Sequence, residues 1–424
     1  MNADSATTVR FLLASRQCEL NSLRYLLQTG ELVGKISQMV HMLQRERGTS
    51  NLYLCTQGRL CGEQLAQRAQ DALTAQVALL HHLDQLETLT ATLPQASRLL
   101  SRVASVVYAL SLLPALRQQV RQLTAQDAIA FFNDTIRHLL ALVFELSDAA
   151  AEPAISRALI AQFSFMQGKE LAGQERAAGV AALAAGQFDE HSQHTLLDLI
   201  ERQDRCFATF AEFCDAAHRQ RWLDLTPDSE FERLRRIACT RRTRQAADEA
   251  ESLRWFSVAT QRIDGMKQLE DELQTSLMDL CRARIAVQEQ ANNEQRADIS
   301  SLMGQQIQDE GGYAVFMPHA GHEQGEWLAN DEGVTPQLSR SLLSLVQQQA
   351  RRLQALDHEL TTLRVTLNER KAIDRAKSLL MQHRALSEEE AYKTLRRMAM
   401  NQNKKLVEIA TAMLAVADIL QESP

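Results

Sequence analysis

Residues 32–43 read LVGKISQMVHML, and this stretch decides the fold class of the chain. Its apolar residues recur at intervals of three and four, which places them on one face of an α-helix: Leu32, Ile36, Met39, Val40 and Leu43. Helical spacing of this kind continues from residue 31 to about residue 298, with prolines in or near the breaks. The sequence therefore predicts a domain of bundled amphipathic helices.

The composition also favours helices. The 424 residues include 16 glycines and 7 prolines, roughly 5% of the chain where about 12% is usual, so a turn-rich β architecture is disfavoured. With 45% hydrophobic and 23% charged residues the chain resembles ordinary globular proteins, and its length exceeds that of a single domain. We expect an all-α protein of several domains.

Several functional classes are disfavoured by the residues that are missing. The sequence has no HExxH motif, no P-loop and no glycine-rich dinucleotide turn, so an enzyme is not expected. The net charge of −7 argues against a protein that coats nucleic acid along its whole surface. Seven cysteines, odd in number, scattered and without a CxxC pair, predict neither disulfides nor a metal site and fit a reducing compartment.

One uncharged stretch needs testing as a membrane span. Residues 103–116 are 14 residues long, shorter than the roughly 18 to 20 that cross a bilayer. The N-terminus lacks the long apolar core and cleavage site of a signal peptide. We therefore expect a cytoplasmic protein with no membrane contact.

The composition changes after residue 298. Glycines and prolines crowd into residues 299–336, which predicts a flexible linker. Residues 337–368 then carry apolar side chains at alternating intervals of four and three, with one polar position: Leu342, Val346, Gln349, Leu353, Leu356, Leu360, Leu363 and Leu367. This pattern predicts a coiled-coil helix and a homodimer joined through 342–367, although a helix packed within its own chain would have the same pattern.

The last segment, 369–424, has ten basic and five acidic residues up to residue 405. Ser387 and Glu390 form a capping box, which predicts a helix that begins at Glu388. Apolar spacing on either side predicts two more amphipathic helices. Together they indicate a small three-helix domain.

Both ends of the chain resemble known families. The C-terminal motif is similar to that of ANTAR domains, the RNA-binding output modules of bacterial antiterminators: Glu369-Arg370-Lys371, Ala376-Lys377, Leu380-Met381, Ser387-Glu388, Glu390-Ala391-Tyr392, Leu395-Arg396 and Ala399-Met400-Asn401. Two helical motifs within 31–298 resemble those of NIT domains, which sense nitrate and nitrite: Leu43-Gln44-Arg45-Glu46-Arg47-Gly48 with Ser50, and Lys169-Glu170 with Gly173-Gln174-Glu175-Arg176.

This pairing implies a function. It is typical of one-component regulators that bind nitrate or nitrite as a signal, use no cofactor, and bind hairpins of a leader mRNA to prevent transcription termination. A different class remains open from the residues alone, namely a coiled-coil signalling adaptor whose helical bundle binds a protein partner.

Arginines are the predicted nitrate ligands, because a guanidinium offers a planar fork of donors to a planar anion. The resemblance points to Arg47, Arg176 and Arg236, with Arg233 and Arg235 as close rivals of the third. Without the resemblance, each would be interpreted as a surface arginine. The Glu-Arg motifs at Arg47 and Arg176 are offset by 129 positions, which indicates either two related bundles or a chance echo.

The predicted RNA contacts combine a basic helical face with neighbouring polar side chains. Cations supply phosphate contacts, and single-stranded loops are recognised through exposed bases. The candidates are Arg375, Lys377, Lys393, Arg396, Arg397, Met400, Gln402 and Lys404. For Tyr392, stacking on a base and packing in the core are both open. No DNA partner is expected.

Overall fold

The computed structural model describes residues 3–90, 96–148, 152–185, 190–225, 229–240, 249–305, 313–316 and 327–330, together with parts of 351–421. The chain divides into two compact units, 1–352 and 353–424. The helices of the first unit are α1 (Ala3–Cys55), α2 (Gln64–Thr90), α3 (Ala96–Ser111), α4 (Leu113–Gln119), η1 (Val120–Gln122), α5 (Ala125–Asp148), α6 (Pro153–Ala184), α7 (Glu190–Phe213), α8 (Ala216–Asp224), α9 (Ser229–Thr240) and α10 (Glu249–Gln305).

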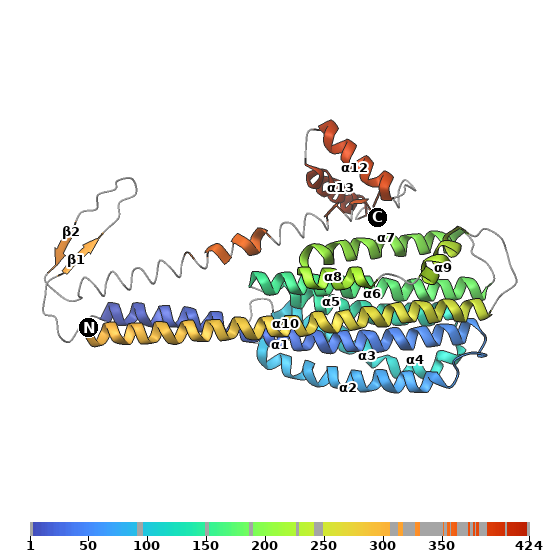
Figure 1. Cartoon of the computed structure of the whole chain (residues 1–424), viewed down its shortest axis with the longest axis horizontal. Coiled ribbons are helices and arrows are strands. Elements are labelled where there is room, and N and C mark those ends of the chain that lie inside the picture. Colours follow the sequence, from blue (N-terminus) through green and yellow to red (C-terminus); the bar gives the residue numbers. More distant parts are fainter. Residues whose placement is uncertain are drawn as a thin grey trace. The chain divides into compact units, whose positions relative to one another are not determined.

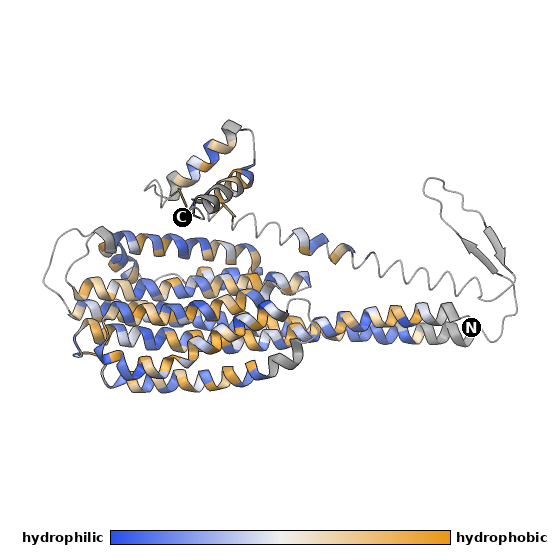
Figure 2. Cartoon of the chain, turned by 180° about the vertical axis from the view of Figure 1, so that it is seen from behind, coloured by the Kyte–Doolittle hydropathy of each residue, from blue (hydrophilic) through white to orange (hydrophobic). Residues whose placement is uncertain are grey.

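The first unit is a bundle of long helices that lie side by side (Figure 1). Helix α1 packs against α2, α5, α6 and α10, and α6 packs against α7 and α10. The predicted apolar stripe of α1 is buried, since Ile36, Met39, Val40 and Leu43 are each 0% exposed. Burial of each such side chain contributes roughly 1.5 to 3 kcal/mol. Hydrophobic and hydrophilic residues alternate along the helices (Figure 2), as amphipathic bundle helices require. The predicted all-α bundle is confirmed.

Helices α1 and α10 continue beyond the bundle as an antiparallel pair (Figure 1). Arg24 Nη2 donates to Glu289 Oε1 at 2.7 Å, and Gln288 Nε2 donates to Glu19 Oε2 at 3.3 Å. Helix α1 thus begins well before residue 31, where the sequence predicted the start of the domain, and α10 runs past residue 298. The helical pair extends the bundle into a two-helix stalk.

The predicted linker contains a short hairpin that the sequence did not predict. Strands β1 (Tyr313–Phe316) and β2 (Trp327–Asn330) pair antiparallel, with Tyr313 opposite Asn330 and Phe316 opposite Trp327. These two short strands are an addition to an otherwise helical chain. Four-residue strands are too short to show a clear alternating pattern among the neighbouring glycines.

The second unit has helices α12 (Glu388–Gln402) and α13 (Leu406–Gln421). Helix α12 begins at Glu388, where the capping box predicted it. Residues 372–373, 376–377 and 379–380 are also helical. These segments meet in one core of Ala376, Leu380, Ala391, Leu395, Ala399, Ile409 and Ala410. The packing agrees with a small three-helix domain.

Only part of the predicted coiled coil is described. Residues 351, 354–356 and 358–362 are helical, and Leu360 is buried. The other seam positions, except Leu356, lie outside the described residues. The coiled coil therefore stays a prediction.

The described chain has one segment long and apolar enough to cross a membrane, Ser97–Gln122, and 33% of it is buried. It is longer than the stretch considered from sequence. Val106, Leu110, Leu113 and Leu116 from this segment pack in the core of the bundle. This packing accounts for its high hydropathy.

Candidate functional site

Helices α1 and α6 run parallel and approach closely in the middle of the bundle. Gln44 Nε2 donates to Glu170 Oε2 at 2.8 Å, and Asn51 Nδ2 donates to the Ala177 carbonyl at 3.0 Å. Both bonds join residues 126 positions apart, as they must between parallel helices. Two glycines leave the space that this approach needs, Gly48 on α1 and Gly173 on α6.

Each glycine lies under an arginine from the other helix. A Cβ atom on Gly48 would lie 2.4 Å from Arg176 Nη2, and one on Gly173 would lie 2.5 Å from Arg47 Nη2. Arg47 and Arg176, both predicted nitrate ligands, therefore lie in reciprocal positions across one helix pair. The two Glu-Arg motifs, which are 129 positions apart in the sequence, thus lie opposite each other in the structure.

Arg47 is fully buried and its charge is balanced by a carboxylate. Its Nη1 contacts both Glu170 Oε1 and Asn133 Oδ1, and its Nη2 lies 3.2 Å from Glu170 Oε2. Glu170 also accepts from Gln44 and, at 2.9 Å, from Gln174 Nε2. The carboxylate thus lies in a cradle of donors from both helices.

Arg176 is also buried, at 2% exposure, but its partners are neutral. Nη1 donates to Thr260 Oγ1 at 2.8 Å, Nη2 donates to the Gln44 carbonyl at 2.7 Å, and the Phe256 ring lies 5.1 Å away. Its Nε has no hydrogen-bond partner. Among the described residues it forms no ion pair with a carboxylate. Burial, and after it the charge of Arg47, lowers the pKa of Arg176 to about 9.

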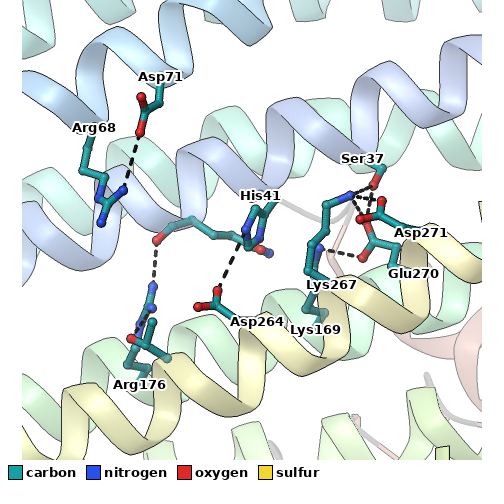
Figure 3. Close-up of polar contacts among 12 residues, drawn as sticks. Ser37, His41, Arg68, Asp71, Lys169, Arg176, Asp264, Lys267, Glu270 and Asp271 are labelled. Carbon is teal, nitrogen blue, oxygen red and sulfur yellow. Dashed lines mark hydrogen bonds and ion pairs between the residues drawn. The ribbon is translucent and has the colours of Figure 1, made fainter. Parts of the chain in front are cut away.

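A second group of buried polar residues lies further along the bundle from Arg176, on α1, α6 and α10 (Figure 3). Lys169 and Glu270, each 0% exposed, form an ion pair at 2.6 Å, and Ser37 Oγ donates to the same carboxylate. His41 lies between this pair and Arg176. Burial, followed by the nearby cations, lowers the pKa of His41 to about 2, so this histidine is neutral.

These contacts leave one uncompensated charge. Arg47 is paired with Glu170, and Lys169 is paired with Glu270. Arg176 alone among these three buried cations lacks a carboxylate. A buried cation without a counter-ion is costly, so this position favours a small anion.

The third predicted nitrate ligand lies elsewhere. Arg236 is exposed on α9, whereas Arg235 turns inward and its Nε and Nη2 bind Glu175 Oε1 and Oε2 at 2.7 and 3.0 Å. The buried residues of this helix are Phe231, Leu234 and Ala238. These three residues form the buried face of α9. Residue 235 lies at the edge of that face, and residue 236 lies on the opposite side of the helix. The structure therefore does not bring Arg236 together with Arg47 and Arg176.

The second unit presents a basic face on α12. Lys393, Arg396 and Arg397 are exposed, on the side away from Ala391 and Leu395. This agrees with their predicted solvent exposure.

Tyr392 and Lys377 lie together beside that face. Tyr392 is 43% exposed, so core packing is not its role, and Lys377 Nζ lies 5.9 Å from the centre of its ring. Lys377 itself is buried, which its assignment as an RNA contact did not anticipate. Arg375, Lys404 and the side chains of Met400 and Gln402 lie outside the described part of the chain.

Metal ligands and disulfides were not expected from the sequence. Within the described residues, no group of three or more histidine, cysteine, aspartate or glutamate side chains could hold a metal ion. All seven cysteines are free thiols.

Comparison with known proteins covers the whole chain. Residues 38–278 match the NIT family, described as nitrate and nitrite sensing, and residues 361–414 match the ANTAR domain. The chain is 37% identical to the nitrate regulatory protein of Klebsiella oxytoca, over 100% of this chain and 99% of that one. It is also similar to a solved structure of the NasR transcription antiterminator, with a TM-score of 0.61, 34% identity and coverage of 97% and 99% of the two chains.

Proposed function

This chain belongs to the family of nitrate regulatory proteins that join a NIT domain to an ANTAR domain, and on that premise we propose that it is a one-component regulator of transcription antitermination. The helical bundle senses nitrate or nitrite. The C-terminal unit binds hairpins of a leader mRNA and prevents the terminator from forming. The chain is a regulator and not an enzyme.

The observation that carries the sensing function is the unpaired charge of Arg176. Nitrate is a monovalent planar anion that can accept hydrogen bonds from two guanidinium groups. Each hydrogen bond to a charged group contributes roughly 1.5 to 3 kcal/mol. Binding beside Arg176 would neutralise its charge and satisfy its free Nε. The bundle thus offers a small anion a buried guanidinium that has no carboxylate partner.

The ligand-binding residues in this proposal are Arg47 and Arg176. Both come from motifs that resemble the NIT family, and both lie at the same helix crossing. Arg236 remains a prediction from the sequence, and it is exposed on α9 whereas Arg47 and Arg176 are buried.

The RNA-binding function rests on the exposed face of α12. Lys393, Arg396 and Arg397, which are exposed, would contact phosphates, and such contacts contribute affinity independent of sequence. Tyr392 offers an exposed ring on which an unpaired base can stack. Arg375, Lys377, Met400, Gln402 and Lys404 remain candidates from the sequence.

We further propose a cytoplasmic homodimer joined through 342–367. The heptad spacing of that segment supports the dimer. A dimer would present two RNA-binding units, which suits a leader with paired hairpins.

The function is tested by measuring leader RNA binding and transcription read-through with the full chain, with and without nitrate. We expect nitrate to increase both in the wild-type protein and to have no effect in Arg176→Ala. Arg137→Ala is the matched control, because the side chain of this arginine is 74% exposed on α5. Equal read-through with and without nitrate in the wild type would contradict the proposal.

A further inference from the structure

The carboxylate of Glu170 occupies a site built for a planar anion. It accepts from Arg47 Nη1, from Arg47 Nη2 at 3.2 Å, from Gln44 Nε2 at 2.8 Å and from Gln174 Nε2 at 2.9 Å. Glu170 is 5% exposed and Arg47 is 0% exposed, so water does not supply these bonds. Four convergent donors around a buried carboxylate are more than a single ion pair needs.

This donor set matches nitrate as well as it matches a carboxylate. Both groups are planar, carry one negative charge, and present two oxygens to the fork of a guanidinium. Nitrate has a third oxygen, which a carboxylate lacks.

The two arginines share a neighbour that brings their sites together. The side chain of Gln44 donates to Glu170, while its backbone carbonyl accepts from Arg176 Nη2 at 2.7 Å. An anion in the cradle is therefore next to the unpaired guanidinium. Glu170, fixed to its own helix, leaves Arg176 without an ion pair.

We infer that Glu170 is a built-in competitor that sets the selectivity of the sensor, an inference that rests on the proposed nitrate function. Nitrate enters by replacing the Glu170 carboxylate in the fork of Arg47. An anion that binds Arg47 alone only replaces the bonds that Glu170 made, and it leaves the buried Glu170 carboxylate without its counter-ion. Net affinity comes from an additional bond to Arg176, which a third oxygen supplies. Nitrate is thus preferred over two-oxygen anions such as nitrite, formate and acetate.

The inference is tested by isothermal titration of the full chain with nitrate and formate. In Glu170→Gln the internal carboxylate is gone and the volume is conserved. We expect nitrate to bind at least tenfold more tightly than in the wild type, and formate to bind measurably.

The matched control is Glu175→Gln. Glu175 lies on the same helix and is 1% exposed, and its partners are Arg235, Gln203 and Arg262 rather than Arg47 or Arg176. Its replacement should leave nitrate affinity unchanged. An equal gain in both variants would mean that removal of any buried carboxylate has this effect, and would overturn the inference.

A second variant covers the case in which Glu170→Gln folds poorly. Glu170→Ala leaves a space the size of acetate, so added acetate should refill the cradle and weaken nitrate binding in proportion to its concentration. Acetate should not affect nitrate binding by the wild type.

Unchanged or weaker nitrate affinity in a folded Glu170→Gln, or no effect of acetate on Glu170→Ala, overturns the inference. These outcomes are distinct from failure of the proposed function. If the proposed function itself were wrong, the wild type would bind no nitrate, or Arg176→Ala would bind nitrate as well as the wild type.

Discussion

The guanidinium of Arg176 lies directly over Gly48, so close that a Cβ atom on residue 48 would lie 2.4 Å from Nη2. Hydrogen bonds to Gln44 and Thr260 hold the guanidinium in place, and it cannot move aside without breaking them. The glycine is therefore part of the proposed nitrate site although it offers no functional group.

Gly48→Ala should displace Arg176. We expect the free energy of unfolding to fall by about 1 to 3 kcal/mol, as for other overpacked sites, and nitrate affinity to fall at least tenfold. Urea unfolding and calorimetric titration measure the two effects. Gly265→Ala is the control, because a Cβ atom there meets only ordinary contacts at 3.4 Å. Wild-type nitrate affinity in a folded Gly48→Ala would show that the position of Arg176 is not required.

Arg176→Lys tests whether the planar fork matters beyond its charge. A lysine keeps the cation but cannot donate two parallel bonds to one anion. We expect a loss of nitrate affinity of about tenfold or more, since a hydrogen bond to a charged group contributes roughly 1.5 to 3 kcal/mol. Arg137→Lys, at a position 74% exposed on α5, should bind nitrate as the wild type does. Full affinity in Arg176→Lys would exclude forked recognition at this residue.

The lowered pKa of Arg176 predicts a dependence on pH. Burial lowers the pKa of Arg176 from its ordinary value to about 9 in the folded chain. Above about pH 9 and below that ordinary value the unfolded chain binds more protons at this residue, so its contribution to folding stability rises with pH in that window. Nitrate needs the cation, and its affinity should fall as the pH passes about 9.

Titrations between pH 7 and 10 measure this fall, and urea unfolding of Arg176→Gln isolates the contribution to stability. Constant nitrate affinity up to pH 10 would show that Arg176 stays protonated throughout.

The buried ion pair of Lys169 and Glu270 should be sensitive to the loss of one partner. Glu270→Gln leaves the buried Lys169 without a counter-ion, and we expect it to lower the free energy of unfolding by roughly 3 to 5 kcal/mol. Lys169→Met should cost less, because Lys267 Nζ still lies 3.9 Å from Glu270 Oε1. In the double variant, the free energy of unfolding should fall by less than the sum of the decreases in the two single variants. A double-mutant cycle by urea unfolding measures this coupling. Additive losses would mean that the two side chains do not depend on each other.

The salt dependence of RNA affinity should distinguish the contribution of the basic residues of α12 from that of Tyr392. Arg397→Ala should reduce the slope of RNA affinity against salt by about 0.7 to 0.9 for each phosphate that the variant no longer neutralises. Tyr392→Ala should lower affinity by roughly 1 to 3 kcal/mol for one stacked base while the slope stays unchanged. Thr411→Ala, exposed on α13, is the control. A changed salt slope in Tyr392→Ala would argue against stacking.

The helical fold and one part of the site could be predicted from the sequence. The spacing of Ile36, Met39, Val40 and Leu43 fixes a buried stripe because helical periodicity is local. Arg47 and Arg176 could be predicted from their motifs. Their mutual contact could not, because it joins residues that are far apart in the chain.

The remaining site residues depend on the register between helices. Nothing near Arg47 in sequence indicates that Glu170 neutralises it, and nothing near Arg176 indicates that Thr260 binds it. The choice between Arg235 and Arg236 is a matter of one position, about 100° around the helix. Which of the two arginines faces inward depends on the packing of Phe231, Leu234 and Ala238 in the core.

Helix α10 has a mechanical consequence. It is one helix of 57 residues that holds Thr260, the hydroxyl partner of Arg176, and ends at Gln305. At 1.5 Å per residue, the distance from Thr260 to that end is roughly 65 Å. A tilt of 5° about Thr260 would move the far end by roughly 6 Å, about the length of one helical turn. A lever arm of this length can turn the rearrangement of a single hydrogen bond into a displacement large enough to reposition a whole side chain.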